Sequence, residues 1–186
     1  MTPAFVSVED YLAGEEQSNI KHEYLGGVIH AMAGGTNNHA AIATNAGISV
    51  GSQFRGKPCR TFGSDAKLKI EFADHIRFYY PDLQIVCRPN PGSDHFQEHP
   101  VLVIEVLSES TRRSDMGEKK DAYLAIPSLK VLLLVESDRP RVIANRRRAA
   151  GGFEAEEYTG RDAVIALPEV EAELPFLELY DGITFA

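Results

Sequence analysis

The sequence predicts an α/β (α+β) protein with a central mixed β-sheet flanked by helices. The run Val101–Leu107, a helical segment and the apolar run Val131–Glu136 follow one another in the order of a βαβ unit, for which a right-handed crossover is expected. Residues 36–53 have the apolar spacing of a long amphipathic helix. The 186 residues, 44% of them hydrophobic, can form one core, so we expect a single domain over residues 1–186.

The N-terminal part is expected to form a helix, a strand pair and a second helix. Ser7-Val8-Glu9-Asp10 has the form of a capping box, which predicts a short helix to about Glu15. Residues 21–32 alternate loosely around Gly26-Gly27, as in two strands joined by a turn. Thr36 is a suitable N-cap for the long helix. Its inward face carries His39, Ile42, Ala43, Ala46 and Val50.

The rest of the chain is expected to be rich in strands. Buried strands are predicted at Cys59–Phe62, Ala66–Phe72, Phe78–Val86, Val101–Leu107 and Lys130–Glu136. Residues 88–100 contain glycine and proline and predict a loop. One helix is expected over Arg113–Ala125, before Pro127. Weaker strands at Arg141–Ala144, Phe153–Tyr158 and Val164–Leu167, and a short helix around Leu174–Leu179, are expected to complete the fold.

Charge and cysteine content exclude some classes of protein. The net charge of −8 argues against a general binder of polyanions, although local charge decides the matter for a nuclease. Two local clusters are basic, residues 55–69 and residues 139–148, and each suits either a solvated face or a phosphate track. Cys59 and Cys87 form no CxxC motif, so we expect a buried reduced pair and no zinc site. The sequence has no signal peptide or membrane span, so a cytoplasmic location is the default expectation.

One acidic residue lies inside the most apolar strand. Glu105 occupies the run Val101–Leu107, where an ionised carboxylate without a partner costs several kcal/mol or more. Asp82 begins another apolar strand, and antiparallel pairing of the two strands would bring the carboxylates together. Two carboxylates can hold Mg²⁺ or Mn²⁺ and leave positions for water and phosphate. Glu136 ends a further buried strand and is expected to be solvent-exposed at the edge of the sheet.

The helix that follows Glu105 provides the basic group that such a metal site needs. Asp115, Lys119 and Tyr123 are spaced at i, i+4 and i+8, which places them on one helix face. The spacing alone is more typical of an exposed ion pair between Asp115 and Lys119.

Several motifs in this chain resemble one family of proteins. They are His22-Glu23-Tyr24-Leu25-Gly26-Gly27, Asn38-His39, Tyr80-Pro81-Asp82, the run from Val103 through Glu105-Val106-Leu107-Ser108 to Thr111, and Asp115-x-x-x-Lys119-x-x-x-Tyr123. In these motifs the sequence resembles a bacterial restriction endonuclease family that was formerly catalogued as a domain of unknown function. This family belongs to the PD-(D/E)XK nuclease superfamily. The resemblance covers the chain from about Tyr11 to Ile183.

The resemblance implies a restriction endonuclease-like fold and a magnesium-dependent endonuclease acting on DNA. Asp82 and Glu105 would be the metal ligands. Leu107 stands where the superfamily has its lysine. The resemblance assigns that role to Lys119, with Lys120 as the alternative and Lys67 and Lys69 as weaker candidates.

Two further residues join the candidate catalytic set through the resemblance. Glu23 matches an upstream acid that could orient water or a ligand, and a purely structural carboxylate is the equal alternative. His39 is expected either to face the site or to be an ordinary core histidine. A homodimer is expected because a two-fold axis matches duplex DNA. The alternatives are an inactive binding module that keeps the nuclease fold, or a hydrolase of a smaller phosphodiester.

Overall fold

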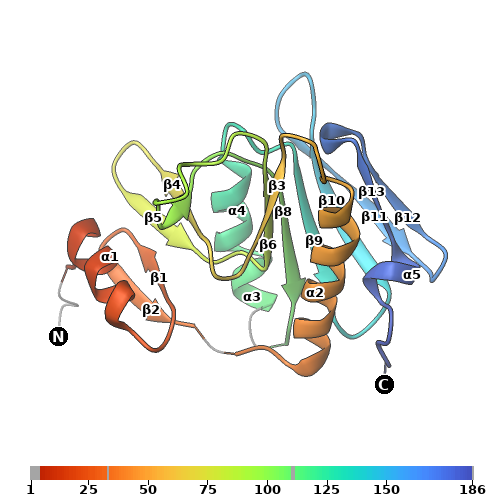
Figure 1. Ribbon diagram of the computed structural model, residues 1–186, viewed down its shortest axis with the longest axis horizontal. Helices are drawn as coiled ribbons and strands as arrows, with labels where there is room; N and C mark the ends of the chain where they lie inside the picture. Colours follow the sequence, from red (N-terminus) through yellow and green to blue (C-terminus); the bar gives the residue numbers. More distant parts are fainter. Residues whose placement is uncertain (1–4, 33, 110–111, 186) are drawn as a thin grey trace.

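The computed structural model describes residues 5–32, 34–109 and 112–185, and its elements form two β-sheets with helices between and around them (Figure 1). The first sheet has the order β2-β1-β5-β4-β7 and the second has the order β11-β10-β9-β8-β6-β3. The strands of the first sheet are β1 (His22–Leu25), β2 (Val28–Ala31), β4 (Lys67–Glu71), β5 (Ile76–Tyr79) and β7 (Phe96–Gln97). Those of the second are β3 (Arg60–Gly63), β6 (Leu83–Val86), β8 (Pro100–Leu107), β9 (Val131–Glu136), β10 (Arg141–Arg147) and β11 (Phe153–Thr159).

The remaining elements are a small hairpin and short or medium helices. The hairpin strands are β12 (Val164–Leu167) and β13 (Ala172–Pro175), joined by the 3-10 turn η1 (Pro168–Val170). The helices are α1 (Val8–Gln17), α2 (Asn37–Ser52), α3 (Arg112–Asp115), α4 (Glu118–Leu124) and α5 (Phe176–Leu179). The predicted α+β class with mixed sheets and flanking helices is confirmed. No helix in the described ranges is long and apolar enough to cross a membrane.

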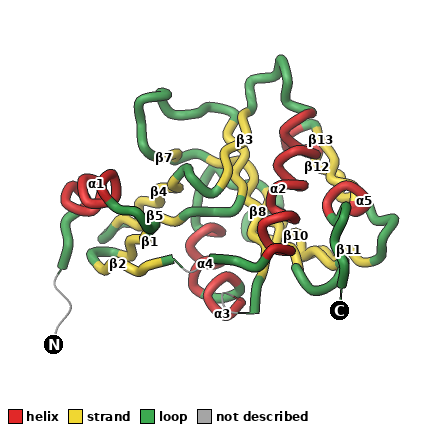
Figure 2. Tube along the Cα trace, turned by 60° about the horizontal axis from the view of Figure 1, so that its bottom comes forward, coloured by secondary structure: helices red, strands yellow, loops and turns green. Residues whose placement is uncertain are grey.

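Successive residues of the central strands pack against opposite layers, because side chains alternate along a strand. From β8, Leu102, Ile104 and Val106 belong to the core that α2, α5 and the β12–β13 hairpin cover. Val103 and Leu107 belong to a second core with α4 and with β4 of the first sheet. The second sheet therefore lies between α2 on one face and α4 on the other, and both faces of β8 are buried (Figure 2).

The predicted βαβ unit and both predicted N-caps are present. β8 and β9 are parallel, with Glu105 opposite Leu134. Ser7 and Thr36 cap α1 and α2 by accepting hydrogen bonds from the backbone N–H groups of Asp10 and His39. The buried face of α2 includes Ile42, Ala46 and Val50, as the apolar spacing predicts.

Several element boundaries differ from the prediction. The expected strand Phe78–Val86 is two strands, β5 and β6, which belong to different sheets. The expected helix Arg113–Ala125 is divided into α3 and α4 at Gly117, whose backbone is not helical. The predicted loop 88–100 contains the short strand β7, and residues up to Pro175 extend as β13 before α5 begins. Thr111, which ends one of the family motifs, lies outside the described residues.

The expectation of reduced cysteines is wrong. Cys59 and Cys87 form a disulfide. β3 pairs with β6 so that Arg60 lies opposite Val86. Cys59 precedes Arg60 and Cys87 follows Val86, so this antiparallel register places the two cysteines opposite each other. The bond closes a stretch of 28 residues and fixes the edge strand β3 to β6, the strand that follows Asp82.

Candidate active site

Asp82 lies where the chain crosses from the first sheet to the second. β5 ends at Tyr79 and β6 begins at Leu83, so Tyr80-Pro81-Asp82 forms the crossing. The Oδ2 atom of Asp82 accepts a hydrogen bond of 2.8 Å from the backbone N–H of Val106 on β8. This bond fixes the carboxylate against the neighbouring strand.

Glu105 lies beside Asp82 because β6 and β8 are antiparallel neighbours with Leu83 opposite Ile104. Its side chain shares the face of β8 that carries Val103 and Leu107, the face that α4 covers. Glu105 is only 3% exposed, and its Oε2 atom lies 3.4 Å from the backbone nitrogen of Asp82. The expected meeting of the two carboxylate-bearing strand ends is therefore present.

The partner that the buried Glu105 requires is Lys119 on α4. Lys119 Nζ lies 3.0 Å from Glu105 Oε1, 3.1 Å from Glu23 Oε1 and 3.8 Å from Asp115 Oδ1. One turn further along α4, the Tyr123 hydroxyl donates a 2.6 Å hydrogen bond to the same Oε1 atom of Glu105. It is thus Lys119, rather than Lys120, that the structure places against Glu105.

The break between α3 and α4 shapes this cluster. Asp115 belongs to α3 and Lys119 to α4, so the two do not share one continuous helix as the spacing suggests. A Cβ atom at Gly117 would lie 2.9 Å from the carbonyl oxygen of Arg113, which is closer than real Cβ contacts. Glycine therefore permits the chain to turn here and still bring both side chains to Glu105.

Glu23 and His39 reach the cluster from two other elements. Glu23 is on β1 of the first sheet and approaches from the side of Lys119. His39 is in the first turn of α2, and its Nε2 atom lies 3.2 Å from Asp82 Oδ2. A Cβ atom at residue 35 would come within 2.7 Å of the His39 ring, so Gly35 leaves room for the imidazole. The predicted residues Glu23, His39, Asp82, Glu105 and Lys119 are all brought together.

Burial and neighbouring charges shift the ionisation of these groups. Burial raises the pKa of Glu105 to about 8, and the nearby Asp82 adds to the rise while Lys119 opposes it. Burial alone would lower the pKa of Lys119, but the carboxylates of Glu105, Glu23 and Asp115 outweigh burial and raise it. The hydrogen bond to Asp82 raises the pKa of His39. Lys119 therefore keeps its proton, and Glu105 is the group that readily gains one.

These side chains line a cleft of about 680 Å³ between α2, the Tyr80-Pro81-Asp82 crossing and the turn after β3. Its wall includes His39, Asp82, Glu105, Asp115 and Lys119. The cluster has four acids and two bases, so a net negative charge remains when all six groups are charged. The acids are Glu23, Asp82, Glu105 and Asp115, and the bases are His39 and Lys119. Such a donor set favours a cation.

The free carboxylate atoms suit a divalent metal with few protein ligands. Among the described residues Asp82 Oδ1 accepts no hydrogen bond, and Glu105 Oε2 has only the long contact with the Asp82 nitrogen. No set of three His, Cys, Asp or Glu side chains within the described ranges has the arrangement of a complete metal cage. Mg²⁺ commonly binds to one or two carboxylates and keeps several waters, so Asp82 and Glu105 fit this ion.

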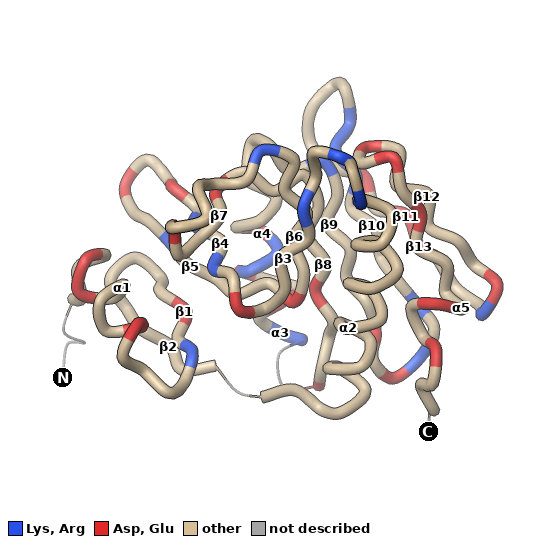
Figure 3. Tube along the Cα trace, viewed as in Figure 1, with Lys and Arg blue, Asp and Glu red and all other residues tan. Residues whose placement is uncertain are grey.

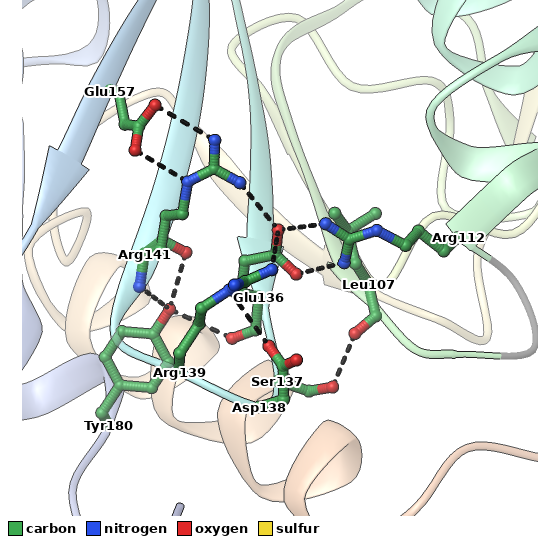
Figure 4. A network of polar contacts seen from close by, with 9 residues as sticks. All are labelled: Leu107, Arg112, Glu136, Ser137, Asp138, Arg139, Arg141, Glu157 and Tyr180. Carbon is green, nitrogen blue, oxygen red and sulfur yellow. Dashed lines mark hydrogen bonds and ion pairs between the residues drawn. The ribbon is translucent and has the colours of Figure 1, made fainter.

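A second charged cluster, which the sequence does not reveal, lies beyond the end of β8. Glu136 at the end of β9 is 1% exposed, which corrects the expectation of a solvent-exposed residue. Figure 4 shows Arg112 approaching Glu136 from α3, and Arg139 and Arg141 approaching from the β9–β10 hairpin. Burial opposes ionisation, but the Arg112 hydrogen bonds hold the pKa of Glu136 below its usual value. The cluster ties α3, which carries Asp115, to the second sheet.

The two basic clusters in the sequence do not form an open phosphate track. Arg141 pairs with Glu157 at 2.8 Å, and Arg146 pairs with Glu156 and Glu169 at 2.9 and 2.8 Å. Lys69 pairs with Glu98 at 2.9 Å. Basic and acidic positions are interspersed along the chain (Figure 3). Most of the positive charge in these clusters therefore stabilises strands of the protein itself.

Asp115 and Tyr123 also belong to the site. Their spacing from Lys119 indicates a shared helix face, but it does not predict that Asp115 contacts Lys119 or that Tyr123 contacts Glu105. A carboxylate and a phenol four residues on either side of a lysine are also typical of an exposed helix face. The burial of all three residues is what distinguishes them, and burial depends on how α3 and α4 pack between the sheets.

Comparison with known proteins gives consistent results over almost the whole chain. Two uncharacterized proteins of Synechocystis sp. (strain PCC 6803) are similar: one is 32% identical over 97% of this chain and 94% of its own length. The other is 30% identical over 73% of this chain and 77% of its own length. A crystal structure described as a putative nuclease belonging to DUF820, from Anabaena variabilis, superposes with a TM-score of 0.74 at 17% identity, covering 96% of this chain and 99% of that one. The family model described as "Uma2: Putative restriction endonuclease" matches residues 8–177, and the chain belongs to this family.

Proposed function

We propose that this protein is a divalent-metal-dependent nuclease that hydrolyses phosphodiester bonds of DNA. The proposal rests on one observation above all. In a cleft large enough for a nucleotide, Lys119 Nζ lies 3.0 Å from Glu105, and Glu105 lies against Asp82 on the adjacent strand end. Family membership and the fold shared with a nuclease-like structure support the same chemistry.

Asp82 and Glu105 would hold the metal. When bound, Mg²⁺ or Mn²⁺ polarises the scissile phosphate and lowers the pKa of water, which is the chemistry that phosphodiester hydrolysis requires. The backbone N–H of Val106 and the imidazole of His39 both contact Asp82 Oδ2, so Oδ1 is the oxygen that Asp82 has available for a metal.

Lys119 acts as an electrostatic clamp and not as a general base. A lysine that takes a proton from water needs a lowered pKa, whereas the three carboxylates around Lys119 raise its pKa. Its ammonium lines the cleft and can offset the negative charge that develops on the phosphate. We propose that it performs the task of the lysine that Leu107 replaces, from the following helix.

Glu23 and Tyr123 keep Lys119 and Glu105 in position. Glu23 forms an ion pair with the Lys119 ammonium, and Tyr123 donates to the Glu105 oxygen that Lys119 also contacts. With Oε1 occupied in this way, Oε2 is the oxygen that Glu105 has available for a metal.

Cleavage of supercoiled plasmid DNA in Mg²⁺ or Mn²⁺ tests the proposal. Asp82→Asn and Glu105→Gln should each reduce the cleavage rate by at least about 100-fold, because each removes one of two proposed ligands. Glu109→Gln is the matched control, since Glu109 is exposed and follows the same strand. Equal rates for all four proteins, or activity in EDTA, would refute the assignment. Parallel assays with bis(p-nitrophenyl) phosphate would identify a preference for smaller phosphodiesters.

A binding module that does not cleave is the second candidate. One observation favours it: Lys119 and Tyr123 already satisfy Glu105 Oε1 without a metal. Calorimetric titration with Mn²⁺ separates the two candidates, because the binding module requires no metal and the nuclease requires one.

We further propose that the protein acts on DNA as a homodimer in the cytoplasm. Two-fold symmetry would let one subunit address each strand of a duplex. Light scattering coupled to gel filtration, with and without a duplex oligonucleotide, would give the mass of the protein in both states.

A further inference from the structure

One buried lysine outside the active-site cleft has no ion pair among the described residues. Lys67, the first residue of β4, is 8% exposed, and its ammonium forms no salt bridge or hydrogen bond with the part of the chain that the structure describes. Its ammonium lies 5.4 Å from the centre of the Tyr80 ring, an attraction that compensates only part of the lost hydration. Buried lysines are rare unless paired, so Lys67 is a candidate for binding a ligand of opposite charge.

The two acids that act electrostatically on Lys67, Glu15 and Glu16, have other partners. Glu15 accepts hydrogen bonds of 2.9 Å from the Tyr80 hydroxyl and from the backbone N–H of His22. Glu16 pairs with His95 at 3.1 Å. Burial lowers the pKa of Lys67, although both acids counteract this effect. An anion reaching the ammonium would restore the missing compensation.

Lys67 forms part of the wall of a second pocket of about 590 Å³, which adjoins the active-site cleft. The pocket also includes Phe62, Asn90, His95, Phe96 and Gln97, which combine aromatic surface with polar side chains. Asp65 borders both the pocket and the cleft. Tyr80, whose ring faces Lys67, lines the cleft two residues before Asp82. The pocket and the cleft therefore lie side by side and share part of their wall.

We propose that this pocket is a subsite for a flanking nucleotide of the nucleic-acid strand, with Lys67 binding its phosphate. The inference rests on the proposed nuclease function, because it takes the ligand to be the strand that the cleft holds. The aromatic side chains Phe62 and Phe96 offer surface for the base, as in other sites for single-stranded nucleic acid.

Binding of a single-stranded hexadeoxythymidylate with a 5′-phosphate, measured by fluorescence anisotropy in EDTA, tests the subsite without cleavage. Lys67→Met should weaken binding by about 10- to 100-fold, the loss expected for a charge-assisted contact, and Lys67→Arg should largely retain it. Lys69→Met is the matched control: it removes a positive charge from the same strand face, but Lys69 is already paired with Glu98 and Glu71. Its binding should stay within twofold of the wild-type value.

Other outcomes would overturn the subsite. They are equal weakening by both methionine variants, no effect of Lys67→Met, or no binding by the wild type. Competition with inorganic phosphate distinguishes the ligand: displacement at concentrations similar to those of the oligonucleotide would indicate a site for free phosphate and refute the strand assignment. Lys67-dependent oligonucleotide binding in a protein that cleaves no DNA would leave the subsite standing and refute the hydrolysis. Cleavage by a Lys67→Met variant whose oligonucleotide binding is unchanged would refute the subsite and leave the proposed hydrolysis standing.

Discussion

Replacing Lys119 by methionine should destabilise the protein in a strongly pH-dependent way. Lys119 is the only ammonium among the described contacts of Glu105, and its side chain is 7% exposed. The substitution would remove this ammonium from three carboxylates at the same time. They are Glu23, Glu105 and Asp115, whose side chains are 17%, 4% and 6% exposed. Removing one partner of a buried ion pair costs about 3–5 kcal/mol, and we expect a loss in this range at pH 10, where Glu105 of the wild type is ionised.

The loss should shrink as the pH falls. Without Lys119, the pKa of Glu105 in the folded protein rises further above its value in the unfolded chain, because burial and Asp82 both favour the neutral acid. A raised carboxyl pKa weakens the folded state as the pH rises from the unfolded value towards the folded one, so the wild type loses stability up to about pH 8 and the variant continues to lose it above that pH. At pH 5 the carboxyl group is protonated in both folded proteins, so the destabilisation should be less than about half of that at pH 10.

Urea unfolding followed by circular dichroism at pH 5 and pH 10 measures both quantities. Lys120→Met is the matched control and should change stability by less than about 0.5 kcal/mol at either pH. The double variant Lys119→Met/Glu105→Gln should recover much of the loss at pH 10, because it removes the uncompensated charge. A loss for Lys119→Met below about 1 kcal/mol at pH 10, or equal losses at both pH values, would refute this account of the cluster.

Three further predictions follow from other contacts. A metal must displace the proton from Glu105, whose pKa is raised to about 8. The apparent Mn²⁺ affinity, measured by calorimetric titration, should therefore rise up to tenfold per pH unit from pH 6 to 8 and then level off. An affinity that does not change with pH would contradict this. Reducing the Cys59–Cys87 disulfide, which spans 28 residues, should lower the free energy of unfolding by about 3–4 kcal/mol. Urea titrations with and without reductant measure this difference. A Cys59→Ser/Cys87→Ser control should not respond to reductant. Glu136→Gln should cost about 1–3 kcal/mol, since the arginines around it are partly exposed, and unchanged thermal stability would show that the cluster does not hold α3.

Local patterns predicted the elements that dominate the fold. The apolar runs that form β8 and β9 are long enough to be recognised as strands buried on both faces, and the helical segment between them makes the pair parallel. The same reasoning identifies Glu105 as a residue in need of a partner. Thr36 and the apolar face of α2 were equally informative, because capping and helical spacing are properties of nearby residues.

Features that depend on distant pairing were not predictable in this way. Phe78–Val86 is mostly apolar, and only the packing of two separate sheets shows that Tyr80-Pro81-Asp82 interrupts it as a strand. The disulfide depends on the register of β3 against β6, which brings together residues far apart in the sequence. Glu136 was misjudged because the three arginines around it come from two separate elements.

Gly117 is an intermediate case. A glycine inside a helical pattern lowers helix propensity by roughly 1 kcal/mol, so the division between α3 and α4 had a signal in the sequence. The convergence of Asp115 and Lys119 across that division had none, because it depends on how each short helix packs against the sheets.

The most direct test of the proposed metal site is an anomalous difference map from crystals of the wild-type protein grown with Mn²⁺. We expect one strong peak in the cleft, about 2.1 Å from an oxygen of Asp82 and from an oxygen of Glu105, with the Lys119 ammonium still beside Glu105. The peak should be absent from Glu105→Gln crystals grown in the same way. A wild-type map without a peak between these carboxylates, at a pH above 8, would contradict the central claim.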